Sequence, residues 1–505
     1  MKINCPIFQQ AEQMSGSPAV IDARQTWTYF QLDRIVSRAV TFLEQKGIRR
    51  QTRVALVGRN SWEYIVLLSA LWRMDAIAVP LNFRFPPGRV NEILKRQGID
   101  HIIAGAADAM NFKESGTTID WEECIHYLHY VQQDTPLSGH KQIDLNNQAA
   151  IILTSGSTGI EKGVLHTYGN YYYNALGSNE NIKLAPGDRW ILSLPLFHVG
   201  GLGILFRCFI AGATVIVPQE NEKESLDESL KTYRVTHASL VSTQLLRLID
   251  RLGEGQAAYG SFSHLKALLL GGSGFPAALI HKALSLNLPI HTSYGLSEMA
   301  SQVTTTPPGA PADKLFTSGK LLAHRELLID KNNEICVKGK TLFKGYVEGT
   351  VITRPWGNES RGGWFHTGDL GRIDADGYLT VLGRRDNMFI SGGENIVPEE
   401  IEAILNELPE VEQVVVVPVA NEMYGFRPAA FLKLRGNAMV TKDYLLNHLQ
   451  EKLPRFKIPD FFYLWPEGLE QTSLKIKRSV FQELLQIDLF SPQAVDQLGK
   501  SRLMV

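Results

Sequence analysis

The order of apolar and polar positions in residues 1–300 predicts short buried strands that alternate with helices. An amphipathic helix is expected near residues 30–46, a strand at 53–57 and a mostly apolar helix at 61–72. Residues 110–146 are polar and aperiodic, so they predict a connection with some strand. Further strands are expected at 149–153, 190–194, 213–217, 236–241, 266–270 and 289–293. This alternation is typical of mainly parallel sheets with helices packed on their faces.

Beyond residue 300 the pattern changes to turns and short β segments. Residues 331–333 predict a hairpin turn, and a helix is expected to begin at Pro398. The predicted fold is therefore α/β. Residues 1–385 form a large N-terminal domain of mainly parallel sheets flanked by helices, plus a β-rich subdomain. Residues 386–505 form a small mobile α+β domain, with strands at 411–417 and 427–434 and helices at 441–453 and 479–487.

Composition favours a protein that acts on small molecules. The 505 residues exceed what one hydrophobic core usually serves. The formal net charge of −1 gives no field that attracts nucleic acid or an anionic membrane. Charged residues interrupt the apolar stretches at 64–81 and 198–218, so no integral membrane segment is expected. The four cysteines have no metal-ligand spacing, and the N-terminus lacks a signal-peptide core, which predicts a cytoplasmic protein with free thiols. An oligomer remains open.

A loop of small and hydroxylic residues follows the strand expected at 149–153. It reads Thr154-Ser155-Gly156-Ser157-Thr158-Gly159-Ile160-Glu161-Lys162-Gly163. Glycines let the backbone approach a ligand, hydroxyls donate hydrogen bonds and the lysine adds a positive charge, which together suit a polyphosphate. Glu161 and Gly163 flank the lysine, so this is not a Walker A loop. Taken alone, such a stretch also fits an ordinary surface turn.

Other loops with chemical groups follow expected strands, where ligands of parallel sheets bind. They contain Pro195-Leu196-Phe197-His198, Gly271-Gly272-Ser273-Gly274 and Ser293-Tyr294-Gly295-Leu296-Ser297-Glu298. Further along are Trp364-Phe365-His366-Thr367-Gly368-Asp369, Gly383-Arg384-Arg385-Asp386 and Leu474-Lys475-Ile476-Lys477-Arg478.

In this order, the motifs resemble those of the acyl-adenylate-forming superfamily, which contains acyl-CoA synthetases, peptide-synthetase adenylation domains and luciferases. Residues 195–207, 239–245 and 293–302 are most similar to the CoA ligases that act on o-succinylbenzoate in menaquinone and phylloquinone biosynthesis. The resemblance covers nearly the whole chain. It implies that a small carboxylic acid reacts with Mg-ATP to give acyl-AMP, and that coenzyme A then displaces AMP.

The resemblance also implies which side chains hold the nucleotide. Lys162 and its loop would bind the β- and γ-phosphates, and Glu298 would coordinate Mg2+, which prefers oxygen ligands. Asp369 and Arg384 would bind the ribose. From residue type alone, each charged group also fits a solvated surface side chain. The implied ATP contacts are Thr154, Ser155, Gly156, Ser157, Thr158, Gly159, Lys162, Gly271, Gly272, Ser273, Tyr294, Gly295, Ser297, Asp369 and Arg384.

Two residues of the C-terminal part are implied to act in turn. Lys475 would bridge the attacking carboxylate and the α-phosphate during adenylation, with Lys477 as the rival in the neighbouring register. Asp386 would be the hinge about which the small domain rotates before CoA reacts. The residues implied to be catalytic are Lys162, His198, Glu298 and Lys475.

The acyl site is expected around His198, Arg207, Ser293 and Gln302. Arg207 lies in an expected helix that is apolar on almost every side, where an unpaired guanidinium is costly to bury. It therefore needs an anion, either an Asp or Glu of this chain or a second carboxylate of the substrate. For His198, a positioning role near the acyl group and a hydrogen-bonded core histidine are both open.

Two positions depart from the superfamily pattern. Glu161 stands where proline is usual, and Leu474 stands where glycine is usual. Because of these departures, a non-catalytic nucleotide-binding relative remains open as a function. A ligase for another aryl or medium-chain acid and a peptide-synthetase adenylation domain also remain open.

Overall fold

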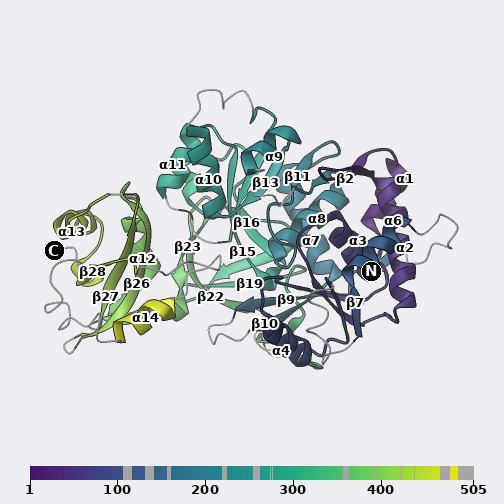
Figure 1. The fold of residues 1–505 in the computed structure, drawn as a ribbon. Coiled ribbons are helices and arrows are strands. Elements are labelled where there is room, and N and C mark those ends of the chain that lie inside the picture. Colours follow the sequence, from purple (N-terminus) through teal and green to yellow (C-terminus); the bar gives the residue numbers. More distant parts are fainter. Residues whose placement is uncertain are drawn as a thin grey trace. The chain divides into compact units, whose positions relative to one another are not determined.

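The computed structural model describes most of the chain, and it divides that chain into two compact units (Figure 1). The first unit contains residues 1–272, 288–327 and 337–365, and the second contains 273–287, 328–336 and 366–505. The described residues are 1–105, 117–130, 141–155, 161–218, 225–253, 262–272, 275, 277–356, 363–391, 394–421, 424–436, 438–466 and 478–486.

An eight-stranded sheet forms one layer of the first unit. Strands β9, β5, β4, β6 and β7 are parallel, and β10, β20 and β21 continue the sheet antiparallel. Alternate residues of β4 enter different cores: Val54 and Leu56 pack with α2 and α3, whereas Ala55 and Val57 pack with α4. The sheet is therefore buried on both faces, as a parallel sheet requires. In spatial order the strands are β21 (Val351–Thr353), β20 (Gly345–Glu348), β10 (Glu161–Thr167), β9 (Gln148–Ser155), β5 (Ile77–Leu81), β4 (Arg53–Val57), β6 (His101–Ala104) and β7 (Thr117–Asp120).

A nine-stranded sheet forms the other main layer of this unit. It is parallel from β15 to β2 and has antiparallel strands at both edges. In spatial order the strands are β17 (Lys320–Leu321), β16 (Ser301–Thr305), β15 (Ile290–Leu296), β14 (Ala267–Leu270), β13 (His237–Leu240), β11 (Arg189–Ile191), β12 (Thr214–Ile216), β2 (Pro18–Ile21) and β3 (Thr26–Thr28).

Helices connect and cover these strands. A capping box at Thr28 begins α2, and Ser61 caps α3 through the amide of Tyr64. The helices are α1 (Pro6–Gln13), α2 (Tyr29–Gln45), α3 (Trp62–Arg73), α4 (Pro87–Gln97), α6 (Trp121–Tyr130), α7 (Tyr168–Ile182), α8 (Val199–Ala211), α9 (Leu226–Thr232) and α10 (Ser242–Gly253), with the 3-10 turn η2 at Ser297–Met299. A short pair of strands, β1 (Lys2–Asn4) and β8 (Gln142–Asp144), adds to this unit.

The second unit contains α11 (Ala277–Ser285) and the C-terminal α+β region. There β26 (Val411–Asn421) and β27 (Gly425–Leu434) form a long antiparallel pair, extended by β24 (Phe389–Ser391), β25 (Glu394–Ile396) and β28 (Phe461–Leu464). The helices are α12 (Pro398–Leu405), α13 (Lys442–Gln450) and α14 (Arg478–Gln486). A separate four-stranded sheet has the order β18 (Arg325–Ile329), β19 (Glu334–Gly339), β22 (Phe365–Ile373) and β23 (Leu379–Arg384).

The predicted fold class is confirmed, because parallel sheets covered by helices precede an α+β region. The hairpin turn at 331–333 and the helix beginning at Pro398 are also present. The expectation for residues 110–146 was wrong in part, since α6 lies there. This helix is held by tertiary contacts: the ring of Tyr127 lies 4.9 Å from that of Phe42, and His129 lies 5.1 Å from Trp62.

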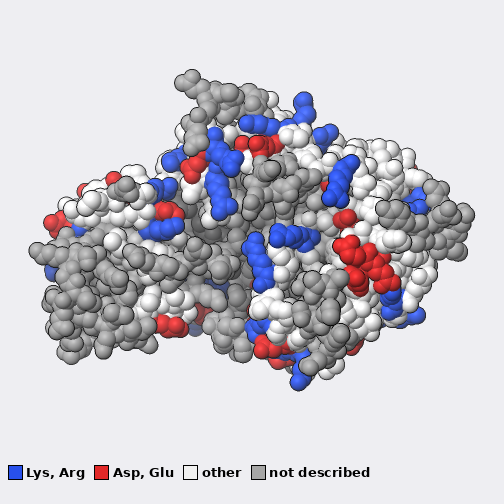
Figure 2. Space-filling model, viewed as in Figure 1, with Lys and Arg blue, Asp and Glu red and all other residues white. Residues whose placement is uncertain are grey.

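Two findings bear on the expected partners. In the described part of the chain, we find no helix of the length and apolarity needed to cross a bilayer. Basic and acidic side chains both occur on the face drawn in Figure 2, in keeping with the net charge of −1.

Candidate active site

The loop expected to hold phosphate joins β9 to β10, which pair as an antiparallel hairpin. Thr154 lies directly opposite Lys162, and Ser155 lies opposite Glu161. Residues opposite each other in such a pair point to the same face, so the Thr154 hydroxyl and the Lys162 ammonium leave the sheet on one side. Gly156, Ser157, Thr158 and Gly159 lie outside the described residues.

Lys162, Tyr346 and Glu298 form a connected group. Strand β20 pairs with β10 so that Tyr346 lies opposite Val164, and the Lys162 Nζ lies 5.3 Å from the centroid of the Tyr346 ring. The Tyr346 hydroxyl donates to Glu298 Oε1 over 2.7 Å. The structure thus joins the predicted phosphate lysine to the predicted metal ligand. Tyr346 was not predicted, because its role depends on a strand register that the sequence does not reveal.

The segment that carries Glu298 is held from behind by His166. The imidazole Nε2 donates to the Ser297 carbonyl over 2.6 Å, and the Tyr171 hydroxyl lies 3.1 Å from Nδ1. Complete burial lowers the pKa of His166 to about 4, so the ring is neutral at physiological pH. A neutral imidazole can donate from Nε2 and accept at Nδ1 at the same time. His166 therefore fixes the backbone beside Glu298 without adding charge.

The turn after Glu298 has an uncommon backbone. Ala300 has a φ of 56° and Ser301 a φ of 122°, two successive non-glycine residues with positive φ. Such strain persists only where the surroundings impose it, and it is concentrated at functional sites. Gly295 is needed on the adjacent strand, since a Cβ there would lie 2.2 Å from the Ser301 carbonyl oxygen.

Several of the residues implied to contact ATP lie at the ends of two neighbouring parallel strands. Gly271 and Gly272 follow β14, and Tyr294 is buried near the end of β15. The Ser293 hydroxyl donates to the Leu270 carbonyl over 2.8 Å, which ties the two strand ends together. Ser273 lies outside the described residues.

Glu161 is paired rather than left beside the phosphate loop. Its carboxylate forms an ion pair with Arg89 of α4, and Arg89 also contacts Glu92 over 2.7 Å. The Glu161 side chain is only 17% exposed. The negative charge that replaces the usual proline is therefore compensated within the first unit.

Arg207 is buried in α8 with a relative exposure of 1%. Its Nη2 donates to the Ser301 hydroxyl over 3.3 Å, and its guanidinium carbon lies 5.2 Å from the Trp190 ring centroid. Within the described ranges no carboxylate forms an ion pair with Arg207, and its Nε has no hydrogen-bond partner. Burial lowers its pKa to about 10, so it is still charged at neutral pH. Arg325 adds a second buried positive charge nearby.

The remaining predicted acyl-site residues lie on either side of Arg207. Gln302 is buried next to Ser301, and its Nε2 donates to the Thr305 hydroxyl over 2.6 Å. His198 precedes α8, with its ring 4.6 Å from that of Phe197. At about 1.5 Å per residue, His198 and Arg207 are roughly 13 Å apart along the helix axis. The structure therefore groups Arg207 with Gln302 rather than with His198.

In the second unit, Asp369 and Arg384 lie opposite each other on β22 and β23. Arg384 Nη1 donates to Asp369 Oδ1 over 2.8 Å and to the Thr367 carbonyl over 3.0 Å. Arg384 also reaches Asp386, the predicted hinge, at 3.4 Å. The two predicted ribose ligands are thus side by side. Lys475 lies outside the described residues.

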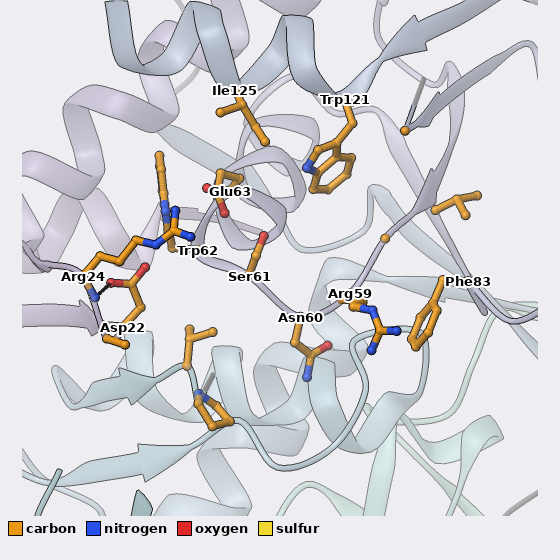
Figure 3. Close-up of a pocket in the computed structure, with 16 residues that line it drawn as sticks. Asp22, Arg24, Arg59, Asn60, Ser61, Trp62, Glu63, Phe83, Trp121 and Ile125 are labelled. Atoms are coloured by element: carbon orange, nitrogen blue, oxygen red, sulfur yellow. Dashed lines mark hydrogen bonds between the residues drawn. The ribbon is translucent and has the colours of Figure 1, made fainter. Parts of the chain in front are cut away.

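The first unit also contains a cavity of about 620 Å³ (Figure 3). It lies where β4, β6, β2 and β12 end, the edge at which parallel sheets bind ligands. The Arg59 guanidinium lies 4.6 Å from the Phe83 ring centroid at its border, and Trp121 forms part of its wall. None of the residues predicted for the acyl or nucleotide site lines this cavity.

Sequence models of known families match both parts of the chain. The model described as AMP-binding enzyme matches residues 7–347, and the model described as AMP-binding enzyme C-terminal domain matches residues 400–474. The chain belongs to the AMP-binding enzyme family.

Particular relatives extend this result. The 2-succinylbenzoate–CoA ligase of Bacillus mycoides (strain KBAB4) is 33% identical over 491 residues, which cover 95% of this chain and 98% of that protein. The o-succinylbenzoate CoA synthetase from Bacillus subtilis, in complex with the acyl-adenylate intermediate OSB-AMP, matches with a TM-score of 0.83 and 28% identity over 100% of both chains. The Bacillus subtilis enzyme in complex with ATP and magnesium ion matches with a TM-score of 0.80 and 29% identity over 92% of this chain and 96% of that one. The predicted resemblance is confirmed.

Proposed function

We propose that the protein is an ATP- and Mg2+-dependent acid–CoA ligase that converts 2-succinylbenzoate to 2-succinylbenzoyl-CoA, a step of menaquinone or phylloquinone biosynthesis. Arg207 is the observation that favours this dicarboxylic acid as the substrate. It is a buried cation with no carboxylate partner among the described residues, and it contacts the hairpin that bears Glu298. One carboxylate of this dicarboxylic acid is activated while the other pairs with the guanidinium. A fatty acid would leave the buried charge uncompensated.

The reaction has two balanced steps. A carboxylate oxygen attacks the α-phosphorus of ATP, and the bond to pyrophosphate breaks. The sulfur of CoA then attacks the acyl carbon, AMP leaves and the thiol proton passes to solvent. Negative charge grows on phosphate oxygens in the first step, so positioned cations lower the barrier. Lys475 acts at the α-phosphate and Lys162 at the β- and γ-phosphates.

The described residues fit the nucleotide and its metal. Glu298 offers a carboxylate held in place by Tyr346 and by the backbone that His166 fixes. Thr154 and Lys162 present a hydroxyl and an ammonium on one face of the hairpin. The carboxylate is a suitable ligand for Mg2+, and the hydroxyl and ammonium groups are suitable hydrogen-bond donors to phosphate. Glu298 would hold Mg2+, which would neutralise phosphate charge when bound.

The second unit supplies the remaining groups. Asp369 and Arg384, joined as an ion pair, present one acceptor and one set of donors to the ribose. Asp386 lies in a short 3-10 turn, Arg385–Asn387, between β23 and β24, which supports a hinge there. The domain boundary then falls at 385/386. All four cysteines are free, which supports a cytoplasmic location.

Pyrophosphate release in the presence of ATP, Mg2+ and single acids tests the proposal. The panel contains 2-succinylbenzoate, benzoate, a medium-chain fatty acid and several amino acids, each with and without CoA. Release with 2-succinylbenzoate, and a thioester only when CoA is present, is expected. Pyrophosphate release with only a different acid would overturn the assignment of 2-succinylbenzoate as the substrate. Pyrophosphate release without thioester formation in the presence of CoA would overturn the assignment as a CoA ligase.

A further inference from the structure

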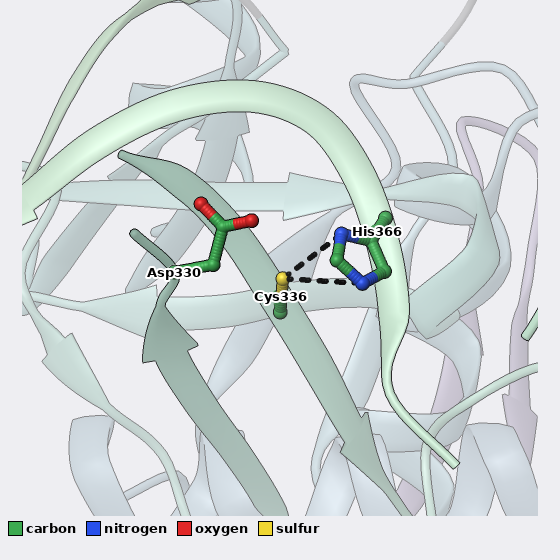
Figure 4. A group of neighbouring side chains, drawn as sticks. All are labelled: Asp330, Cys336 and His366. Carbon is green, nitrogen blue, oxygen red and sulfur yellow. Dashed lines mark hydrogen bonds between the residues drawn. The ribbon is translucent and has the colours of Figure 1, made fainter. Parts of the chain in front are cut away.

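Three side chains of metal-binding type meet at one place in the second unit, and none of them is among the residues proposed to hold Mg2+ (Figure 4). Asp330 lies in the turn between β18 and β19, Cys336 is on β19 and His366 is on β22. One ligand atom from each lies within 4.8 Å of the others. The cysteine spacing gave no sign of such a group, because the partners of Cys336 are not cysteines: Asp330 comes from the preceding turn and His366 from another strand.

The distances suit a bound metal ion. Cys336 Sγ lies 3.3 Å from His366 Nδ1 and 3.9 Å from Nε2. Zinc binds sulfur at about 2.3 Å and imidazole nitrogen at about 2.0–2.1 Å. Two such bonds at a tetrahedral angle separate sulfur from nitrogen by about 3.5 Å. With Nε2 as the ligand, the observed separation of 3.9 Å is about 0.4 Å longer than a tetrahedral site requires, so the two side chains approach slightly when a metal binds.

Glu334 orients the histidine. Its Oε2 lies 3.3 Å from His366 Nδ1 and accepts from Arg385 Nη1 over 2.6 Å, and its Oε1 accepts from the Gly368 amide over 2.8 Å. Glu334 is 1% exposed, so this carboxylate is fixed. When Nδ1 donates to Glu334, the lone pair of Nε2 becomes available to a metal. A carboxylate behind a histidine is the usual arrangement around protein-bound metals.

Of the other two ligands, Asp330 is held in position, whereas Cys336 must lose a proton before it can bind a metal. Asp330 Oδ1 accepts from the amides of Asn332 and Glu334 over 2.8 and 2.9 Å, which holds the carboxylate in the hairpin turn. Cys336 is 1% exposed, and burial raises the pKa of its thiol to about 11. A metal must therefore displace the thiol proton to solvent. The His366 side chain is 48% exposed and leaves the site open to entering ions.

We propose that Asp330, Cys336 and His366 bind a divalent transition-metal ion of the zinc class. Mixed sulfur, nitrogen and oxygen ligands select this class over Mg2+, which takes oxygen alone. Three protein ligands leave one position for water or a small molecule. His366 lies on β22, the strand that also carries Asp369 of the proposed ribose-binding pair.

Cobalt(II) tests the site, because a cobalt–thiolate bond has a charge-transfer absorption that oxygen and nitrogen ligands do not give. The full-length protein is stripped with a chelator, kept reduced with a phosphine and titrated with Co2+ in excess Mg2+. A thiolate band that saturates at one equivalent and is bleached by Zn2+ is expected. Absence of the band in the wild-type protein with excess Co2+ overturns the proposal.

Variants assign the ligands. Cys336→Ser is expected to abolish the band, and His366→Gln, at a half-exposed position, to weaken Co2+ binding at least about tenfold. Cys124→Ser is the matched control, since Cys124 is also buried and free but belongs to no metal-binding group in the described chain. An unchanged band in Cys336→Ser overturns the proposal. If Cys336→Ser fails to fold, unchanged affinity in His366→Gln overturns it equally.

Discussion

Arg89 of α4 and Glu161 of β10 form an ion pair at the start of the strand that carries Lys162. The pair joins α4 to the β9–β10 hairpin, which carries the proposed phosphate-binding loop. It also removes the charge conflict that Glu161 would otherwise create near phosphates.

Arg89→Ala should raise the KM for ATP about three- to tenfold with little change in kcat, because Glu161 is then a largely buried carboxylate without its partner. The double variant Arg89→Ala/Glu161→Gln should recover most of the loss. Pyrophosphate release at varied ATP measures both. A double variant as impaired as the single one would mean that Arg89 acts by some other route.

Tyr346→Phe should raise the Mg2+ concentration for half-maximal activity about ten- to hundredfold, since a hydrogen bond to a charged group contributes about 1.5–3 kcal/mol. Tyr444→Phe is the matched control, because its hydroxyl contacts Glu410 at 3.3 Å on the exposed surface of the second unit. Mg2+ titrations of adenylation compare the two. An equal change in the Mg2+ dependence of both variants would mean that Tyr346 does not support metal binding.

Arg207→Ala should raise the KM for 2-succinylbenzoate about a hundredfold and that for a monocarboxylic acid less than threefold, because only the dicarboxylate pairs with the guanidinium. Steady-state kinetics with both acids give the ratio of the KM for 2-succinylbenzoate to the KM for the monocarboxylic acid. The control is Arg73→Ala, which removes an equally buried arginine already paired with Asp33 over 2.5 Å. It should destabilise the fold by about 3–5 kcal/mol and leave the ratio unchanged. A ratio altered equally by both variants would contradict the substrate assignment.

Lys475→Ala should abolish acyl-AMP formation, with a loss of about 100-fold or more, because it removes a positioned cation from the charge that develops in adenylation. Thioester formation from supplied acyl-AMP and CoA should stay near the wild-type rate. Lys477→Ala is the control for register and should affect neither half-reaction. If Lys477→Ala were the impaired variant instead, the catalytic lysine would lie two residues further along.

Local patterns in the sequence were enough to predict most of the fold. Apolar runs located β4, β13, β14 and β15 to within a few residues, and the motif order predicted the family. The side-chain partners could not be predicted in this way. Tyr346 reaches Glu298 only because β20 pairs with β10 in one register, and Cys336 meets His366 only through the order of strands in another sheet. A shift of one residue would turn either side chain to the opposite face.

For Arg207, the sequence predicted the need for an anion but not its source. The answer depends on the absence of an ion-pair partner in the described residues, which requires coordinates. The helix α6 was missed for a related reason, since its stability comes from aromatic contacts with α2 and α3 rather than from a strong pattern of its own.

The strained turn at Ala300 and Ser301 follows Glu298, the residue proposed to hold the metal, and its second residue, Ser301, contacts Arg207. Under the proposed roles, one end of this turn faces the phosphates and the other faces the remote carboxylate. The rigid backbone of this turn then fixes the distance between the two positions that bind the anionic ends of the acid. Acids with a shorter or longer spacer between their carboxylates cannot satisfy both ends at once, so length rather than hydrophobicity would govern which acids are accepted.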